Sequence, residues 1–185
     1  MTQLPVPPDV RRSPDCPAPA AGPTPEPVRW LDEAEQRVWR SFLDASRMLF
    51  DALDRQLQAD AGMPHAYYEV LVRLSEAGDR TMRMSELADS LASSRSRLSH
   101  AVARLEERGW VRRQADPADR RGQWAALTDE GFTALATAAP GHVDAVRRQL
   151  FDAIGAADVA ALGRISAAIR SAADPCAPDV SEAQL

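Results

Sequence analysis

The sequence contains no lysine and no asparagine, and all 22 of its basic residues are arginines. We attribute this to a GC-rich coding bias, because the preference extends along the whole chain rather than marking one site. No run of apolar residues approaches the roughly 18 that a membrane-spanning helix requires. The N-terminus also lacks the charged-then-apolar pattern of a secretory signal. We therefore expect a cytoplasmic protein with no membrane contact.

Cysteine is scarce, with Cys16 near one end of the chain and Cys176 near the other. Two cysteines in a chain without an export signal are most often reduced thiols. The alternative is a redox-sensing pair, although flexible tails provide no environment that would activate a thiol.

Acidic residues outnumber basic residues by 27 to 22, and the net charge is -5. This balance argues at first against a nucleic-acid-binding protein, because such proteins usually carry a basic surface. The charge is unevenly distributed, however. Residues 80–121 contain ten arginines and six acids, so they carry +4 and leave -9 on the remainder. Positive charge confined to one part of the chain is what binding to phosphates requires.

The 185 residues are enough for one domain with a sizeable core. Residues 1–29 hold nine of the fourteen prolines and predict a disordered arm. Residues 171–185 predict a short flexible acidic tail. We therefore expect residues 30–170 to form the folded domain.

Apolar residues recur at three- and four-residue steps along most of this domain and predict a mainly α-helical fold. The expected helices lie at about residues 30–59, 65–77, 85–91 and 94–108, after Thr128, and around residues 159–169. Ser85 and Thr128 are the predicted N-caps of their helices. Pro140-Gly141 is predicted to kink the helix that follows Thr128 or to split it in two. The first helix is long for a domain of this size, which suggests that it packs against a second chain.

Two predicted strands, residues 110–115 and 123–127, flank a turn that begins with Asp-Pro and ends at Gly122. Because an isolated hairpin is only marginally stable, these strands must pack on the helices or on a partner. Two short helices joined by a tight turn and followed by a hairpin form a winged helix-turn-helix with a two-stranded β wing.

The helix at residues 94–108 is the candidate recognition helix. With Leu98 at the centre of its buried side, small and polar residues face away and allow the helix to enter the major groove of DNA. Arg95 and Arg97 flank this outward face near the helix N-terminus, where the helix dipole attracts phosphate. The predicted contacts on this helix are Ser94, Arg95, Ser96, Arg97, Ser99, His100 and Arg104. The alternative to a DNA-binding role is a solvent-exposed helix that is rich in arginine because the whole chain uses arginine in place of lysine.

The wing adds further candidate DNA contacts. Arg120 and Arg121 lie at the hairpin tip, and adjacent arginines on a rigid projection can enter a narrow minor groove. Asp119 beside them is expected to hold an arginine side chain. Arg112 and Arg113 alternate on the first strand, so only one is expected to face DNA, and we assign that role to Arg112. The alternative for Arg120 and Arg121 is a solvated loop.

Two segments resemble the MarR family of bacterial transcription regulators, LEERGWVRR at residues 105–113 and DPADRRGQWAALTDEG at residues 116–131. The most specific parts are Asp119-Arg120-Arg121 in the wing and Leu127-Thr128-x-x-Gly131 at the start of the next helix. The resemblance covers about residues 30–170. Trp110 departs from the family pattern, in which a smaller aliphatic residue is usual, and Pro140-Gly141 departs by interrupting the fifth helix.

The resemblance implies a homodimeric, sequence-specific DNA-binding regulator, which we expect to be a repressor of a pseudo-palindromic operator. Residues 30–60 and 128–170 would hold the dimerisation helices, and residues 64–127 would bind DNA. The family pattern places base contacts on Ser96, Ser99 and His100, and a minor-groove contact on Arg121. It implies no cofactor.

Many members of the family release DNA when a small aromatic or anionic compound binds between the dimer helices and the winged domain. An arginine beside aromatic walls would suit an aromatic carboxylate. The candidate ligand residues are Trp39, Arg47, His65, Tyr67, His142, Arg147 and Phe151. Each also has an ordinary structural role: dimer core for Trp39 and Phe151, a helix start for His65, a local hydrogen bond for His142 and a surface charge for Arg147.

No pattern of residues points to an enzyme. The histidines at 65, 100 and 142 are scattered without paired ligand spacing, so we expect no metal site. A phosphate-cradling glycine loop and the GxSxG elbow are both missing from the sequence. Two alternatives to the operator-binding regulator stay open: a thiol-based oxidant sensor that uses Cys16 or Cys176, and a helical protein-interaction module whose winged helix binds protein.

Overall fold

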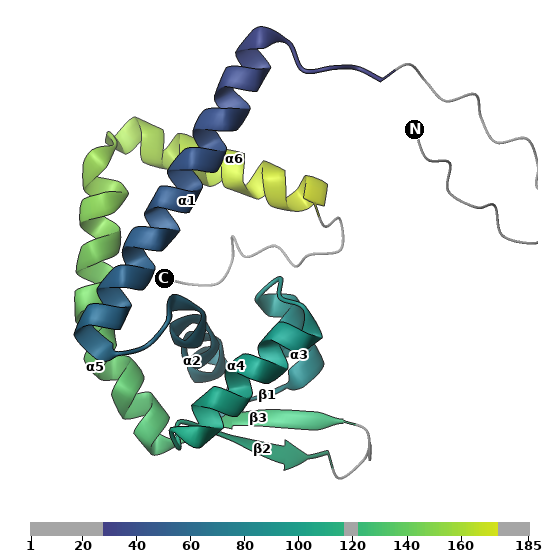
Figure 1. The fold of residues 1–185 in the computed structure, drawn as a ribbon, viewed down its shortest axis with the longest axis vertical. Helices are drawn as coiled ribbons and strands as arrows, with labels where there is room; N and C mark the ends of the chain where they lie inside the picture. The colour runs from purple at the N-terminus through teal and green to yellow at the C-terminus, as the bar shows by residue number, and fades with distance from the viewer. Residues whose placement is uncertain (1–27, 117–121, 174–185) are drawn as a thin grey trace, which may run out of the picture. The chain divides into compact units, whose positions relative to one another are not determined.

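The computed structural model describes residues 28–116 and 122–173, and the chain divides into two compact units at Val38–Trp39. Most of the predicted arm and tail, both cysteines, and the wing residues Asp119, Arg120 and Arg121 lie outside the described residues. Helix α1, Glu33–Ala61, begins in the first unit and continues into the second (Figure 1).

A capping box fixes the start of α1. The Asp32 carboxylate accepts a hydrogen bond from the backbone N–H of Glu35 at 2.8 Å, and the Glu35 carboxylate accepts one from Asp32 N–H at 2.9 Å. This reciprocal pair satisfies two donors that a helix start leaves open. The helix therefore begins at Glu33, three residues after the predicted start.

The second unit contains the winged helix-turn-helix that the sequence predicts. Its remaining elements are α2 (His65–Glu76), η1 (Gly78–Arg80), β1 (Thr81–Arg83), α3 (Met84–Ser90), α4 (Arg95–Glu107), β2 (Val111–Ala115), β3 (Gln123–Leu127), α5 (Asp129–Gln149), η2 (Phe151–Ala153) and α6 (Ala156–Ala173).

The wing belongs to a three-stranded antiparallel sheet with strand order β1-β3-β2. The two predicted wing strands are confirmed, and β1 is an addition, pairing Met82 with Ala125 along β3. Asp79 and Arg80, which precede β1, both have positive φ angles, 52° and 53°, so the chain turns sharply into this strand. A third strand relieves the marginal stability of a lone hairpin.

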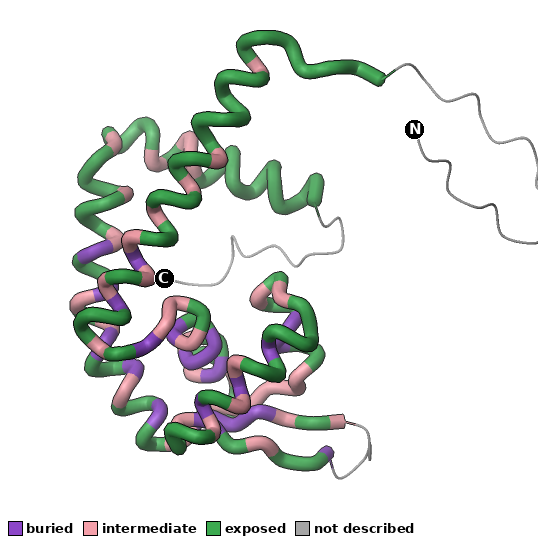
Figure 2. The backbone as a smooth tube through the Cα atoms, in the orientation of Figure 1, coloured by how far each residue is buried: buried purple, intermediate pink, exposed green. Residues whose placement is uncertain are grey.

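The core lies between α2, α3, α4 and the sheet, where the buried segments gather in Figure 2. Leu71, Leu87 and Leu105 contribute one fully buried side chain from each helix. Leu98 and Val102 of α4 are also buried, which confirms the predicted inward face of this helix. The packing of these helices on the sheet gives α4 a fixed orientation relative to the wing.

One local prediction is wrong, and another is narrowed to one of its two alternatives. Ser85 is not an N-cap, because α3 starts one residue earlier at Met84, and its N-cap residue Arg83 makes no side-chain capping bond. Of the two alternatives for Pro140-Gly141, the split is wrong, because α5 runs unbroken from Asp129 to Gln149 with Pro140 inside it, and the kink stays a prediction. Pro140 is exposed while Ala138 and His142 on the packed face are buried, so solvent can still reach the carbonyl that proline leaves without a donor.

The predicted cap at Thr128 is confirmed. Its hydroxyl accepts a hydrogen bond from Gly131 N–H at 3.0 Å and donates one to the Gly109 carbonyl at 2.7 Å. The Thr128 N–H also donates to the Trp110 carbonyl at 3.1 Å. Thr128 therefore ties the start of α5 to the turn between α4 and β2.

Candidate nucleic-acid interface

Helix α4 has the exposed face that the sequence predicts. Ser94 is its N-cap, with its side chain accepting a hydrogen bond from Arg97 N–H at 3.3 Å. The residues from Arg95 to Arg97 are exposed, as are Ser99, His100 and Arg104, whereas Ala103 is half-buried. Small and polar side chains of this kind let a helix approach base edges closely.

The arginines of α4 differ in how their charge is used. Arg104 forms an ion pair with Glu107 at 2.7 Å, and the hydrogen bond to Glu107 raises the pKa of Arg104. Among the residues that the structure describes, the side chains of Arg95 and Arg97 have neither a hydrogen-bond partner nor an ion-pair partner. Both arginines belong to the first turn of α4, where the helix dipole attracts anions.

Arg113 fastens strand β2 to α4. Its guanidinium donates to the Ser99 carbonyl at 2.6 Å and pairs with the Glu106 carboxylate at 3.3 Å, while its backbone N–H also donates to Glu106 at 2.8 Å. Arg112, next to it on the strand, is exposed. This agrees with the predicted alternation, in which Arg112 rather than Arg113 is free to face DNA.

An ion pair between Arg83 and Asp116 was not predicted from the sequence. Arg83 Nη2 lies 2.5 Å from Asp116 Oδ2, and the Asp116 side chain is only 4% exposed. Asp116 N–H donates to the Gly122 carbonyl at 3.0 Å, which closes the base of the hairpin. The Arg83 guanidinium also lies over the Trp124 ring at 5.2 Å. The pair was missed because the sequence did not predict strand β1, which brings Arg83 next to the wing.

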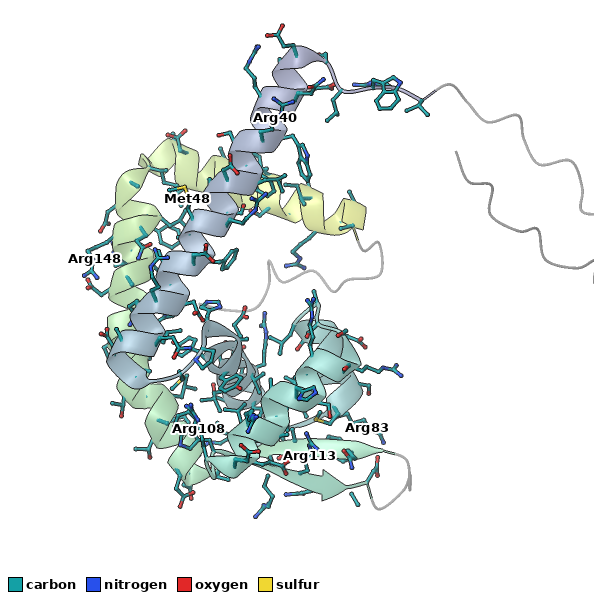
Figure 3. All side chains as sticks on the ribbon, in the orientation of Figure 1. Arg40, Met48, Arg83, Arg108, Arg113 and Arg148 are labelled. Carbon is teal, nitrogen blue, oxygen red and sulfur yellow. The ribbon has the colours of Figure 1, made fainter. Side chains whose placement is uncertain are left out.

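Arg108 follows the C-terminal end of α4, where Figure 3 labels it away from Arg83 and Arg113. Its guanidinium lies 4.9 Å from the Trp110 ring and 5.7 Å from the Tyr67 ring, and it donates to the Gly62 carbonyl at 3.1 Å. The unusual tryptophan at 110 therefore serves as a cation–π partner. Tyr67, a predicted ligand residue, supplies the other ring.

The remaining predicted ligand residues do not form one site. His65 and His142 come together, with ring centroids 5.4 Å apart. Trp39 instead stacks on Phe42, and Phe151 is exposed. The two arginines are engaged elsewhere: Arg47 pairs with Asp44 at 3.8 Å, and Arg147 pairs with Asp152 at 3.4 Å.

The two histidines belong to a polar cluster between α1, α2 and α5. His142 is buried against the Tyr68 ring at 4.4 Å, and its Nδ1 lies 3.2 Å from Gln56 Oε1. His65 Nδ1 lies 3.5 Å from a Glu69 carboxylate oxygen. Sequence reasoning missed Gln56, Tyr68 and Glu69, because only the packing of three helices brings them together.

The environment of this cluster shifts three pKa values. Burial, helped by the nearby His65, lowers the pKa of His142. The hydrogen bond from His65 lowers the pKa of Glu69, and burial raises the pKa of the Tyr68 hydroxyl. The neutral imidazole of His142 is therefore favoured in the folded protein.

Within residues 28–116 and 122–173, no group of three or more histidine, cysteine, aspartate or glutamate side chains is placed to hold a metal ion. No helix of these segments has the length and apolar character that a bilayer crossing would need.

Comparisons with known proteins identify the family. A sequence model of the MarR family matches residues 61–122. Sco3205 is a MarR family transcriptional regulator from Streptomyces coelicolor whose crystal structure was solved in complex with DNA. Its sequence is 51% identical to that of this chain, and the two structures superpose with a TM-score of 0.78 over 86% of this chain and 100% of Sco3205.

Two curated relatives from Escherichia coli match more weakly. The transcriptional repressor MprA of strain K12 is 27% identical over 131 residues, which are 71% of this chain and 73% of MprA. The transcriptional regulator HosA of Escherichia coli O111:H- is 44% identical over 54 residues, so the match spans 29% of this chain and 40% of HosA. Together with the winged fold and the match to Sco3205 over the whole length of that protein, these findings show that the chain belongs to the MarR family of transcriptional regulators.

Proposed function

We propose that this regulator is a homodimeric repressor that binds a pseudo-palindromic operator and is released by a small aromatic or anionic ligand. The observation that carries the proposal is the exposed start of α4, where Arg95 and Arg97 stand without partners among the described residues beside Ser96, Ser99 and His100. Arginines supply the phosphate contacts that dominate affinity, and the smaller polar side chains can read base edges.

Exposed apolar side chains support the dimer. Phe42 and Met48 of α1, Val143 of α5, and Ile165 and Ile169 of α6 are all exposed, and α6 has no buried residue. An amphipathic helix whose apolar side chains contact water gains little from folding, so these surfaces favour burial against a second copy. Apolar exposure on several elements is typical of an interface rather than of a monomer surface.

Two relatives support repression through DNA binding. MprA is named a transcriptional repressor, and Sco3205 was solved in complex with DNA. Operator-bound dimers of helix-turn-helix proteins read two half-sites about one helical turn apart, roughly 34–36 Å. We infer the same spacing for the operator of this chain.

The His65–His142 cluster supports ligand release. Imidazole and phenol rings from α2 and α5 meet there, next to the helices that carry the exposed apolar side chains. Aromatic walls with a few polar groups are typical of small-molecule sites. A ligand that separates these helices would change the distance between the two copies of α4.

Selection of bound sequences from a random duplex pool tests the proposal. We expect enrichment of a two-fold symmetric site with half-sites about one helical turn apart. The selected operator then serves for titration with phenolic acids, with release followed by fluorescence anisotropy. Enrichment of no sequence would contradict operator binding, and failure of every phenolic acid to release DNA would contradict the proposed class of ligand.

A further inference from the structure

A hollow of about 450 Å³ opens between the end of the sheet and the starts of α3 and α4. Arg83 lines it from β1, Ser85 from α3, Arg95 and Ser99 from α4, and Gln123 from β3. Of the three candidate base contacts on α4, Ser99 lines the hollow, whereas Ser96 and His100 are not among its lining residues. The hollow therefore lies at the edge of the outward face of α4.

The lining is basic and rich in hydrogen-bond donors. Arg95 has no side-chain partner in the described part of the chain. The Arg83 side chain is 38% exposed although one edge of its guanidinium holds Asp116, and a guanidinium has five N–H donors in a fixed fork. Of the described residues that line the hollow, none is acidic. Hydroxyl groups of Ser85 and Ser99 and the amide of Gln123 complete the set of neutral donors.

Asp116 and Trp124 orient Arg83. The carboxylate holds Nη2 from the buried side, and the indole ring lies against the guanidinium at 5.2 Å. In the sheet, Arg83 is directly opposite Trp124, which in turn is opposite Gln114, so the three residues form one row across the strands. Figure 3 labels Arg83 and Arg113 in this region of the sheet. A guanidinium held in this way loses little further freedom when it binds an anion.

We propose that this hollow is the subsite for one backbone phosphate of the operator, with Arg83 and Arg95 as its ligands and Asp116 as a positioning residue. The inference rests on the proposed operator binding. When a recognition helix enters the major groove, the sugar-phosphate strands form the groove walls, so a phosphate passes beside the base-reading face. Two guanidinium groups that converge on one phosphate make charge-assisted hydrogen bonds from fixed directions.

This subsite sets the position of α4 on the duplex without reading sequence. Phosphate contacts fix register and orientation, whereas base contacts specify. The hollow is bounded by both the recognition helix and the sheet, so a phosphate bound there would contact both elements at once. Removal of the arginines of this subsite should therefore weaken binding to the operator and to an unrelated duplex by the same factor.

Salt-dependent binding of the full chain tests the phosphate. We would measure the association constant for a selected operator and for an unrelated duplex at several salt concentrations, with wild type, R95Q and R83Q/R95Q. The double variant should lower the slope of log K against log salt by about 0.9, the value for one phosphate. R95Q, which leaves the Arg83–Asp116 pair intact, should weaken binding to both duplexes equally. The matched control is R73Q, since Arg73 is an exposed arginine of α2 paired with Glu76 at 3.4 Å.

The outcomes separate the subsite from the proposed function. If wild type binds no duplex, operator binding itself fails. If wild type binds and R83Q/R95Q keeps the wild-type slope, the subsite is wrong while operator binding stands. A loss of operator affinity alone would show that these arginines read bases, and a decrease in slope of about twice 0.9 would show two separate phosphates; either result overturns the single subsite.

D116N tests the positioning role through the sign of its effect. If Asp116 acts only as a negative charge near DNA, its neutralisation strengthens binding. If it orients Arg83, D116N weakens binding several-fold, and adding D116N to R83Q causes no further loss. Circular dichroism and thermal melting establish that each variant is folded. Should D116N not fold, R83K decides: it keeps the charge without the fork, so affinity below that of wild type supports oriented binding, and wild-type affinity overturns it.

Discussion

The backbone carbonyl of Trp110 occupies the space that a Cβ atom at Gly131 would need. The Trp110 carbonyl carbon lies 2.8 Å from that ideal Cβ position, and Leu127 Cδ1 lies 2.9 Å from it. The same carbonyl accepts a hydrogen bond from Thr128 N–H at 3.1 Å. The Leu127-Thr128-x-x-Gly131 signature therefore marks a backbone-to-backbone junction between the wing and α5.

Substitution of Gly131 tests this junction. G131A places a methyl group against backbone that cannot move aside, so we expect a loss of unfolding free energy at or above the usual overpacking cost of about 1–3 kcal/mol. G141A is the control, because its nearest neighbours, at 3.4 Å, are the ends of the Asp60 and Gln56 side chains. In a helix interior, alanine is favoured over glycine by about 1 kcal/mol. Urea unfolding in which G131A is at least as stable as wild type would contradict a close junction at this glycine.

Adjacent arginines on β2 should differ in what they affect. R113A removes the bonds to Ser99 and Glu106, so it should lower the melting temperature. R112A removes an exposed side chain that we predict to contact DNA. It should therefore weaken operator binding and leave the melting temperature unchanged. Thermal melting and anisotropy on both variants check this. The reverse assignment, with R113A stable and R112A unfolded, would mean that the strand faces the other way.

His142 should make stability depend on pH. Its pKa is lowered in the folded chain by burial and by His65, so the unfolded chain binds a proton more readily than the folded chain. The stability contribution is therefore present above the ordinary histidine pKa of 6.5 and is lost as pH falls through the lower folded value.

We expect the free energy of unfolding to decrease on acidification from about pH 7 toward about pH 5, and H142Q to flatten this decrease. The exposed His100 on α4 gives the control variant, H100Q, which should retain the wild-type profile. Denaturant unfolding at a series of pH values provides the measurement. An H142Q profile as steep as that of wild type would assign the acid sensitivity to other groups, among them Glu69, whose pKa is also lowered.

Charge on α6 should disrupt the proposed dimer. Ile165 and Ile169 are exposed in the single chain, and I165E/I169E places two carboxylates where we infer an apolar interface. Analytical ultracentrifugation should show monomers, with loss of two-site operator binding. The control is R164E, which changes the charge of an exposed residue on the same helix. It should remain dimeric, which would show that added negative charge on α6 does not by itself separate the two chains. A dimeric I165E/I169E would exclude α6 from the interface.

The sequence predicts best those features that depend on nearby residues. The spacing of Leu98, Val102 and Leu105 defined the buried side of α4, and Thr128 was identified as a cap from its own neighbours. Strand β1 was missed because three residues are too few to show alternation, and its pairing depends on distant β3. Pro140 alone does not distinguish a kinked helix from two helices, because the buried residues that hold α5 together are defined only by the tertiary fold.

The candidate site shows the same division. The outward residues of α4 follow from helical periodicity, and their exposure agrees with it. The partners of each arginine do not follow from local sequence. Arg83 with Asp116 and His65 with His142 are far apart along the chain, so only the tertiary fold reveals that a buried acid holds Arg83, whereas Arg95 has no side-chain partner among the described residues.

Operator binding through the start of α4 is tested most directly by its salt dependence in wild type and R95A/R97A, measured by fluorescence anisotropy. We expect log K of wild type to fall linearly with log salt. The variant should bind more weakly and with a shallower slope, by about 0.9 for each phosphate that it no longer neutralises. A wild-type protein that shows no salt-dependent binding to any selected duplex, or a folded variant with the wild-type slope, would contradict this role of α4.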